Sequence, residues 1–356
     1  MRKTCLLVIL AVALHACKKE STTEPPTPPT PPPADTTQQT SDPEPSLLPQ
    51  SISFVKAGAA DQNMTVSFQY LTDQHQINVY WDDTTTANRY DKLAYSYFYN
   101  NDGFVTKREG YDPTGNLYEN ITIERMSDNA VQTVFYNSID AMSQSPVKDT
   151  FAVSVADSVN NPSFKIMTVA HTYRSPWLTP TDPVPIVNRV TFHNNVVLKE
   201  SGGQYYGQRS YSAQPPLEYG YDAFGKRVSE IIGGGTDYTT AYSYETTGHA
   251  LDSFFQVLRG KDGYMLDTEA FWGMYPGSSL TITPLSILLS TPNHVGMVVN
   301  AHQYGILKEV RSVPSGTDLS FAETFNFENT LDAYQRITKT NITHNGSFYA
   351  TWKITY

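Results

Sequence analysis

A four-residue segment that ends in glycine recurs along this sequence between stretches of alternating apolar and polar residues. Asp or Asn opens three of the copies, where its side chain can cap a turn. The closing glycine can adopt the left-handed conformation that a type I turn with a G1 bulge requires. The pattern therefore predicts a succession of β-hairpins, with turns at Asn100–Gly103, Asp112–Gly115, Asp222–Gly225, Glu245–Gly248, Gly260–Gly263 and Thr343–Gly346.

The stretches between these turns have the two-residue period of β-strands. Ile77, Val79 and Trp81 alternate with polar neighbours, and the last nine residues, 348–356, place an apolar or aromatic residue at every second position. Alternation of this kind indicates strands with one covered face. The 24 tyrosines suit such strands, because the ring packs on a pleated surface while the hydroxyl stays solvated.

We therefore expect an all-β fold. The predicted architecture is an antiparallel hairpin meander that forms one large twisted sheet, either an open sheet, a sandwich or a partial barrel. One short helix is expected near 284–290, since Thr283 can cap it, Pro284 suits its first position, and an apolar run follows before Pro292.

The N-terminus has the features of a secretory leader. Arg2 and Lys3 precede a ten-residue apolar run, which is half the length that a membrane-spanning helix needs, about 20 residues. The following segment, Leu14-His15-Ala16-Cys17, resembles the bacterial lipobox, although His15 stands where that motif has a small residue. The resemblance implies that residues 1–16 are a lipoprotein signal peptide and that Cys17 carries the lipid.

Residues 17–50 have the composition of a stalk. Ten of the chain's 23 prolines lie between Pro25 and Pro49, mostly among threonines. Proline fixes φ and removes a hydrogen-bond donor, so the stretch favours an extended polyproline II chain without a core. The β domain is then expected over 51–356, with a further division near 175–185, where four prolines interrupt the strands.

The turns also resemble a known repeat. Tyr-x-Tyr-Asp-x-x-Gly-Lys-Arg-Val at 219–228 is similar to the YD repeat of Rhs-type shells, and related pairs of aromatic residues precede the turns at Asn100, Glu245 and, with a longer loop, after Phe327. The copies are dispersed, so the chain looks most like the uncharacterised β-rich envelope lipoproteins of Bacteroidota that carry such hairpins. This resemblance implies a fold and a cellular location without an activity.

Charge and cysteine content narrow the classes of function. The formal net charge is −10, and loss of the leader with Arg2 and Lys3 makes it −12. Because no cluster of Lys or Arg follows Lys19, nucleic acid is not an expected partner. The only cysteines are Cys5 and Cys17, so the domain has neither disulfides nor a thiol nucleophile. No metal or cofactor is expected, since no histidines stand in a metal-binding spacing.

Two further sets of residues leave the function open. Two distant carboxylates suffice for a glycoside hydrolase, and Asp82, Asp83, Asp267 and Glu269 are the candidates. Aromatic residues outside strands can instead stack on sugars or anchor a protein partner, and the candidates are Trp177, Trp272 and Tyr275.

The residues favour binding without catalysis, with no catalytic residue assigned. We expect an outer-membrane lipoprotein, on either the periplasmic or the cell-surface face, that is attached to the membrane through its N-terminal lipid and binds a glycan or an envelope protein. The alternatives are a hydrolase that uses two carboxylates and a structural subunit of an outer-membrane complex.

Overall fold

The computed structural model divides the chain into two compact units, 1–44 and 45–356. All described residues lie in the second unit. They are residues 46–56, 58, 64–83, 92–112, 114–139, 146–173, 184–194, 196–206, 210–232, 238–261, 304–314 and 322–356.

Eighteen antiparallel strands form one sheet in this unit. Each strand pairs with the next strand along the chain. The strands are β1 (Ser51–Lys56), β2 (Met64–Leu71), β3 (Gln76–Asp83), β4 (Lys92–Tyr99), β5 (Val105–Tyr111), β6 (Leu117–Arg125), β7 (Val131–Ile139), β8 (Pro146–Asp157), β9 (Lys165–Tyr173), β10 (Val184–His193), β11 (Val196–Tyr206), β12 (Ser210–Tyr221), β13 (Arg227–Ile232), β14 (Tyr238–Tyr244), β15 (Leu307–Pro314), β16 (Glu323–Leu331), β17 (Ile337–His344) and β18 (Ser347–Thr355).

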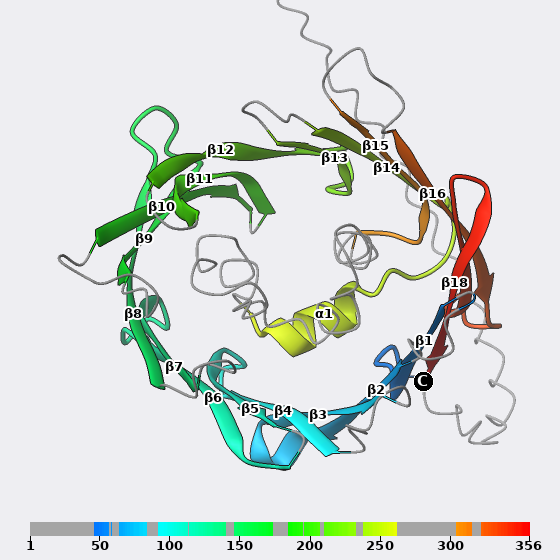
Figure 1. Cartoon of the computed structure of the whole chain (residues 1–356), viewed down its shortest axis with the longest axis horizontal. Helices are drawn as coiled ribbons and strands as arrows, with labels where there is room; N and C mark the ends of the chain where they lie inside the picture. Colours follow the sequence, from blue (N-terminus) through cyan, green and yellow to red (C-terminus); the bar gives the residue numbers. More distant parts are fainter. Residues whose placement is uncertain are drawn as a thin grey trace, which may run out of the picture. The chain divides into compact units, whose positions relative to one another are not determined.

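The first and last strands also pair with each other, which closes the sheet. Ser51 of β1 stands opposite Thr355 of β18, and the register continues to Lys56 opposite Ala350. Figure 1 shows the resulting ring of strands. The predicted all-β antiparallel meander is confirmed, and its form is more specific than the expected open sheet, sandwich or partial barrel, because the pairing of β1 with β18 closes the sheet into a barrel without an unpaired edge.

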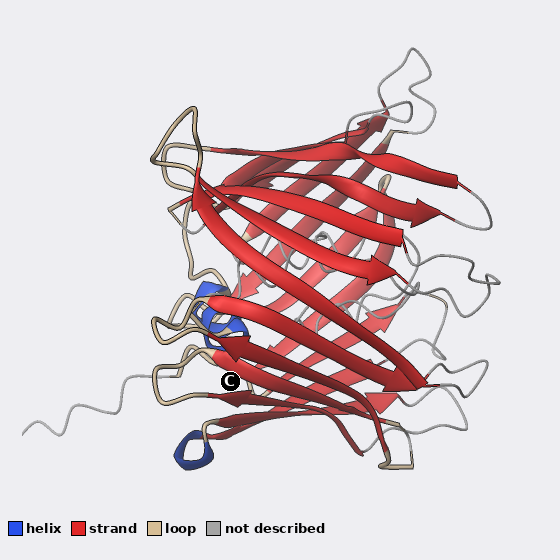
Figure 2. Cartoon of the chain, turned by 90° about the vertical axis from the view of Figure 1, so that its left-hand side faces the viewer, coloured by secondary structure: helices blue, strands red, loops and turns tan. Residues whose placement is uncertain are grey.

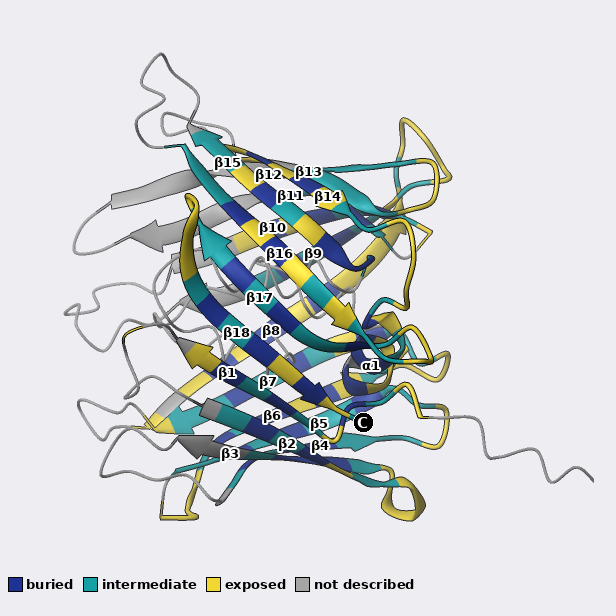
Figure 3. Ribbon diagram, turned by 90° about the vertical axis from the view of Figure 1, so that its right-hand side faces the viewer, coloured by how far each residue is buried: buried dark blue, intermediate teal, exposed yellow. Residues whose placement is uncertain are grey.

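The two faces of the barrel wall differ in character. Phe68 of β2 contacts Phe254 in the helix inside the ring, with 4.9 Å between ring centroids, so its face looks inward. Its directly opposite partner on β3, Val79, shares that face and is also buried. The neighbours of Phe68 along β2, Ser67 and Gln69, face outward and are polar. Buried and exposed residues alternate in the same way along most strands (Figure 3).

Three of the predicted turns form as four-residue hairpin connections. In each, the closing amide donates to the first carbonyl, as from Gly103 to Asn100 at 2.9 Å, and glycine has positive φ at Gly103, Gly115 and Gly225. Hydrogen bonds from Thr114 and Asn116 lower the pKa of Asp112 in the second turn to about 2.

Two further turns of the same form lack glycine. Asn129 (φ 67°) closes the turn after β6, and Gln335 (φ 62°) closes the turn after β16. The latter is the longer hairpin that follows Phe327. The pattern of a closing glycine therefore does not predict these two turns from the sequence.

The remaining three predicted turns differ from expectation. Glu245–Gly248 follows β14 and leads toward a helix instead of a returning strand, and Gly260 is the C-cap of that helix. Between β17 and β18 the hairpin is confirmed, but Asn345 (φ 48°) and Gly346 (φ 81°) are both left-handed. Two successive positive φ values are typical of a two-residue type I′ connection, not of the predicted G1 bulge.

One α-helix, α1 (Asp252–Arg259), lies inside the ring. A short 3-10 helix, Thr72–Gln74, connects β2 and β3. Leu251, Phe254, Phe255 and Leu258 near or within α1 are buried, and the Tyr99 hydroxyl donates to the Leu258 carbonyl at 2.7 Å. We call the end of the barrel where α1 lies the helix end and the other end the far end (Figure 2). The helix expected at 284–290 lies outside the described residues.

Candidate functional site

Most of the residues singled out from the sequence lie outside the described part of the chain. These are Cys17, Trp177, Asp267, Glu269, Trp272 and Tyr275. Asp82 and Asp83 end β3, where they pair with Thr65 and Met64 of β2, and their side chains are not described. No described side chain therefore belongs to the predicted carboxylate pair or to the predicted aromatic contacts, and the described polar surface of the barrel wall is the candidate site.

A transverse row of polar residues crosses the outer face. Its members stand directly opposite one another from strand to strand, so they lie side by side about 4.8 Å apart. We call it the outer polar row, and it consists of Gln69, Asn78, Ser96, Glu109, Asn120, Asn137 and Lys148, one residue on each of β2 to β8.

Hydrogen bonds hold the first part of this row in place. Asn78 donates from Nδ2 to Gln69 Oε1 at 3.1 Å, and its own Oδ1 accepts from the Ser96 hydroxyl at 2.8 Å and from Gln76 Nε2 at 2.6 Å. The Tyr80 hydroxyl donates to the same Gln69 oxygen at 3.0 Å. Asn78 and Ser96 are only 7% and 1% exposed, so they order their neighbours from beneath. This ordering lowers the entropy cost of binding at the members that a ligand can reach, which are Gln69, Glu109, Asn120, Asn137 and Lys148.

Aromatic rings and one ion pair flank the row. Glu109 is paired with Lys107 and accepts from the Tyr111 hydroxyl at 2.6 Å. Partial burial alone would raise the pKa of Glu109, but the contacts with Lys107 and Tyr111 outweigh it, and the pKa is lowered. Burial and Glu109 raise the pKa of Tyr111 to about 12. Lys107 also lies 5.3 Å from the centre of the Phe98 ring. The charges of Glu109 and Lys107 balance, so this part of the row suits a neutral ligand that offers hydroxyl groups.

The inner wall carries a buried ion pair. Arg108 of β5 and Glu119 of β6 face inward and bind each other, with side chains that are 5% and 4% exposed. The guanidinium also lies 5.3 Å from the centre of the Tyr95 ring. Burial alone would lower the pKa of Arg108, but the interactions with Glu119 and Tyr97 outweigh the effect of burial. The pKa of Arg108 is therefore raised above its ordinary value. This pair joins adjacent strands, and the described contacts are those of a structural element.

A second inward cluster centres on Arg227, the first residue of β13. Its guanidinium lies 4.0 Å from the centre of the Tyr219 ring and 5.0 Å from that of Tyr304, and Nη2 donates to the Tyr304 hydroxyl at 3.1 Å. The Tyr219 hydroxyl donates to Glu200 on β11 at 2.8 Å. The cluster therefore connects β11, β12 and β13 to the segment that precedes β15.

The tyrosines that precede the turns have a related structural role. Tyr221 donates its hydroxyl to the Val197 carbonyl at 2.7 Å, and Tyr244 donates to the Arg227 carbonyl at 2.6 Å. Each reaches the beginning of a neighbouring strand and satisfies a backbone acceptor there. Burial raises the pKa of both hydroxyls, so they stay protonated donors at neutral pH. These tyrosines therefore link the strand before each turn to a neighbouring strand.

The described residues hold neither a metal-binding cluster nor a membrane-spanning helix. Within them, no group of three or more His, Cys, Asp or Glu side chains is arranged to hold a metal ion. No helix in the described part has the length and apolar character needed to cross a membrane. The outer polar row was missed from the sequence because the alternation shows which residues face outward but not which of them align across strands.

The sequence matches no family model and no curated protein. Among solved structures, the chain is similar to a porin-like protein from Bacteroides vulgatus ATCC 8482, at 8% identity and a TM-score of 0.38, over 87% of this chain and 98% of that one. It is also similar to a porin-like protein from Bacteroides uniformis ATCC 8492, at 11% identity and a TM-score of 0.21, over 86% of this chain and 97% of that one.

Proposed function

We propose that this chain is a lipid-anchored protein of the bacterial outer membrane, whose barrel stands outside the hydrocarbon layer and binds a glycan or an envelope protein without catalysis. The lipid on Cys17 and the stalk would attach and display the barrel. The observation that carries the proposal is the polarity of the two barrel faces.

The outward face carries charges that a membrane-spanning barrel would turn away from lipid. Outward-facing basic residues occur on six strands around the ring: Lys107, Arg189, Lys199, Arg311, Lys339 and Lys353. In a transmembrane barrel, each Lys or Arg near the middle of the bilayer costs about 2–4 kcal/mol, and apolar residues form the outward band. Here the buried apolar residues face inward, which is the arrangement of a barrel surrounded by water.

The outer polar row supports the binding role. Amide side chains both donate and accept hydrogen bonds, as sugar hydroxyls do. Tyr80 and Tyr111 lie beside the row, and aromatic faces suit the apolar faces of sugar rings. A neutral oligosaccharide that runs across neighbouring strands is the ligand that this chemistry favours.

The anchor is tested by replacing Cys17 with Ala. We expect the variant to lose labelling by a fatty-acid analogue and to leave the membrane fraction, because the acyl chains are the proposed attachment. Wild-type protein that has been carried through the same fractionation is the control. A variant that stays labelled would contradict the lipoprotein assignment.

Glycan binding is tested on an array with the purified protein. We expect Gln69→Ala and Asn120→Ala to weaken a glycan hit about two- to tenfold each, since one lost hydrogen bond costs about 0.5–1.5 kcal/mol. The matched control is Asn341→Ala, on the outer face of β17, where the amide bonds Glu328 and Thr351 in a similar way.

Other results of the array experiment decide between the alternatives. A hit that weakens in Trp177→Ala or Trp272→Ala instead would assign binding to those residues. An array without any hit would contradict glycan binding and favour an envelope protein as the partner.

A pore is the second candidate function. A closed barrel with an even number of antiparallel strands that pair in chain order is the architecture of transmembrane barrels. If the barrel forms a pore, the purified protein should produce stable conductance steps when it is added to a planar bilayer. The outward charges lead us to expect none.

A further inference from the structure

The helix end carries isolated apolar side chains that project into solvent. Phe224 is 87% exposed and Val159 is 98% exposed, although both are large hydrophobic residues. We call the set of exposed apolar residues in the connections and helix at this end the helix-end tips, and it consists of Met126, Val159, Phe224, Val257 and Tyr334.

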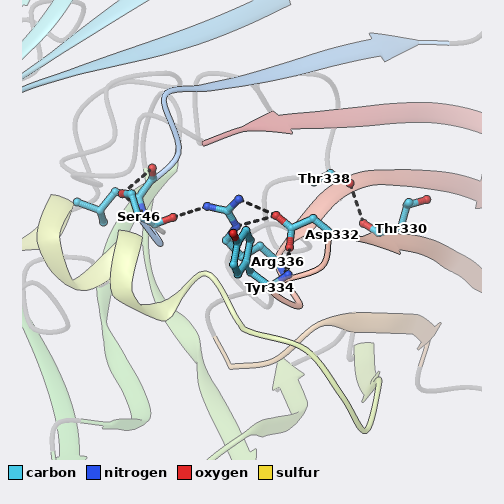
Figure 4. Close-up of polar contacts among 7 residues, drawn as sticks. Ser46, Thr330, Asp332, Tyr334, Arg336 and Thr338 are labelled. Carbon is cyan, nitrogen blue, oxygen red and sulfur yellow. Dashed lines mark hydrogen bonds and ion pairs between the residues drawn. The ribbon is translucent and has the colours of Figure 1, made fainter. Parts of the chain in front are cut away.

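Two of these tips have the same rigid support. Phe224 and Tyr334 each occupy the third position of a four-residue turn that begins with Asp. The Asp side chain accepts from the tip's own amide, at 2.8 Å from Phe224 and 2.9 Å from Tyr334, and also from the amide two residues later. Figure 4 shows the Asp332 turn with Arg336. The turns therefore hold the backbone at the position of each tip, and the side chains there are 87% and 55% exposed.

The tips are distributed around the ring. Met126 follows β6, Val159 follows β8, Phe224 follows β12 and Tyr334 follows β16, while Val257 lies on the exposed side of α1. Partner proteins usually bury a contiguous apolar patch. Isolated apolar side chains that are spread around the end of a barrel can contact one partner at the same time only if that partner has a broad, nearly flat surface.

Cationic side chains accompany the tips. Arg336 lies 4.3 Å from the centre of the Tyr356 ring and 5.3 Å from that of Tyr334, and Lys226, directly after the Phe224 turn, lies 5.7 Å from the Tyr244 ring. Arg336 is only 13% exposed and is paired with Asp332, so of these two cations Lys226 is the one placed to reach a lipid phosphate group. Lys and aromatic side chains occur together in this way at the interface between a bilayer and water.

The chain also enters the barrel at this end. The Ser46 carbonyl accepts from Arg336 Nη1 at 2.6 Å, and Gln50 donates its amide to Thr355 at the end of β18. Cys17 precedes Ser46 by only 29 residues. If the proposed lipid sits on Cys17, the stalk keeps a bilayer within roughly 90 Å of the helix end. Tethering raises the effective concentration of that surface, so even weak contacts suffice.

We propose that the helix end docks on a phospholipid bilayer through the helix-end tips, while the far end points away from it. The inference rests on the proposed function only for the nearness of the membrane. The tips would enter the headgroup region without the barrel crossing the hydrocarbon layer.

Single spin labels test the orientation. The mature chain has no cysteine after Cys17, so Phe224→Cys and Tyr334→Cys each provide one labelling site. Phe348→Cys is the matched control, because Phe348 is 55% exposed, as Tyr334 is, but lies beside the far-end turn at Gly346. The acylated full chain is reconstituted in vesicles of phosphatidylethanolamine and phosphatidylglycerol.

We expect the labels at 224 and 334 to gain collisions with oxygen and to lose collisions with a water-soluble nickel chelate when vesicles are present, while the label at 348 does not change. Labels at 224 and 334 that stay as accessible to the chelate as the label at 348 would overturn the docking proposal.

A flotation experiment separates this proposal from the acyl anchor. The experiment uses the Cys17→Ala chain, which lacks the acylation site, at a lipid concentration high enough for part of it to float without an anchor. Under this condition Phe224→Ser combined with Tyr334→Ser should lower the fraction that floats with the same vesicles, whereas Phe348→Ser should not. An equal fraction for both variants would count against docking. Retention of the acylated chain on vesicles, measured alongside, reports on the anchor alone.

Discussion

Replacing Glu119 with Ala is expected to lower the free energy of unfolding by about 3–5 kcal/mol, because the change leaves the buried Arg108 charge without its carboxylate. The two side chains are only 5% and 4% exposed, so water cannot replace the lost partner. Urea unfolding followed by circular dichroism measures the change. Glu119→Gln should recover part of the loss, since an amide oxygen can still accept from the guanidinium.

An exposed ion pair provides the matched control. Lys199 and Glu218 face each other on the outer surface of β11 and β12, with side chains that are 44% and 50% exposed. Water solvates both partners, so Glu218→Ala should cost about 0–1 kcal/mol. Similar losses for Glu119→Ala and Glu218→Ala would contradict the assignment of the Arg108 pair to the inner wall.

Truncation of Phe254 to Ala should be comparably destabilising, at about 3–5 kcal/mol, because it removes a fully buried ring from the contact between α1 and the wall. The ring lies edge-on to Phe68 of β2 at 4.9 Å and to Phe255 at 5.5 Å between centroids. Urea unfolding gives the stability change. Limited proteolysis within 252–259 should also become faster, because the helix loses its main apolar contact.

The control for this change lies on the same helix. Val257 is 40% exposed, and alanine is a better helix former than valine, so Val257→Ala should change stability by less than about 0.5 kcal/mol. If Phe254→Ala were equally mild, α1 would not be packed inside the barrel as described.

The strands and several hairpins are predictable from the sequence because their signals are local. Alternation predicted the buried face of β3 at Ile77 and Val79, and the turn pattern predicted Asn100–Gly103. Local alternation is wrong at one point in β18: Phe348 is exposed while Ala350 and Trp352 are buried. The register shifts opposite Ile342 and Thr343, which turns Phe348 away from the core.

Closure of the barrel could not be predicted in the same way. It depends on the pairing of β1 with β18, whose residues are about 300 positions apart in the chain. The period of two shows which residues share a face, but it does not determine which distant strands meet. The same reason hides the outer polar row, whose members align only when the register of seven strands is known.

The helix was missed for a different reason. α1 has eight residues, and no side-chain hydrogen bond caps its first turn. Asp252 and Ser253 precede the apolar run in the sequence, but both lie inside the helix, and its N-cap is Leu251, a residue that gives no start signal. Its apolar residues Phe254, Phe255 and Leu258 match helical spacing, but a segment of this length is also consistent with a strand or a loop.

The position of the barrel relative to the bilayer is tested most directly by labelling outward residues in native membranes. Thr122→Cys, Asn326→Cys and Lys353→Cys place single thiols on the outer faces of β6, β16 and β18, where the native residues are exposed. Ile123→Cys, one residue away but 6% exposed and inward-facing, is the control that should react only after unfolding.

A barrel outside the hydrocarbon layer predicts that all three outward thiols react with a membrane-impermeant maleimide as completely in membranes as in detergent. Protection of the three thiols in membranes, with reaction restored by detergent, would mean that lipid surrounds the wall and would contradict the proposed function.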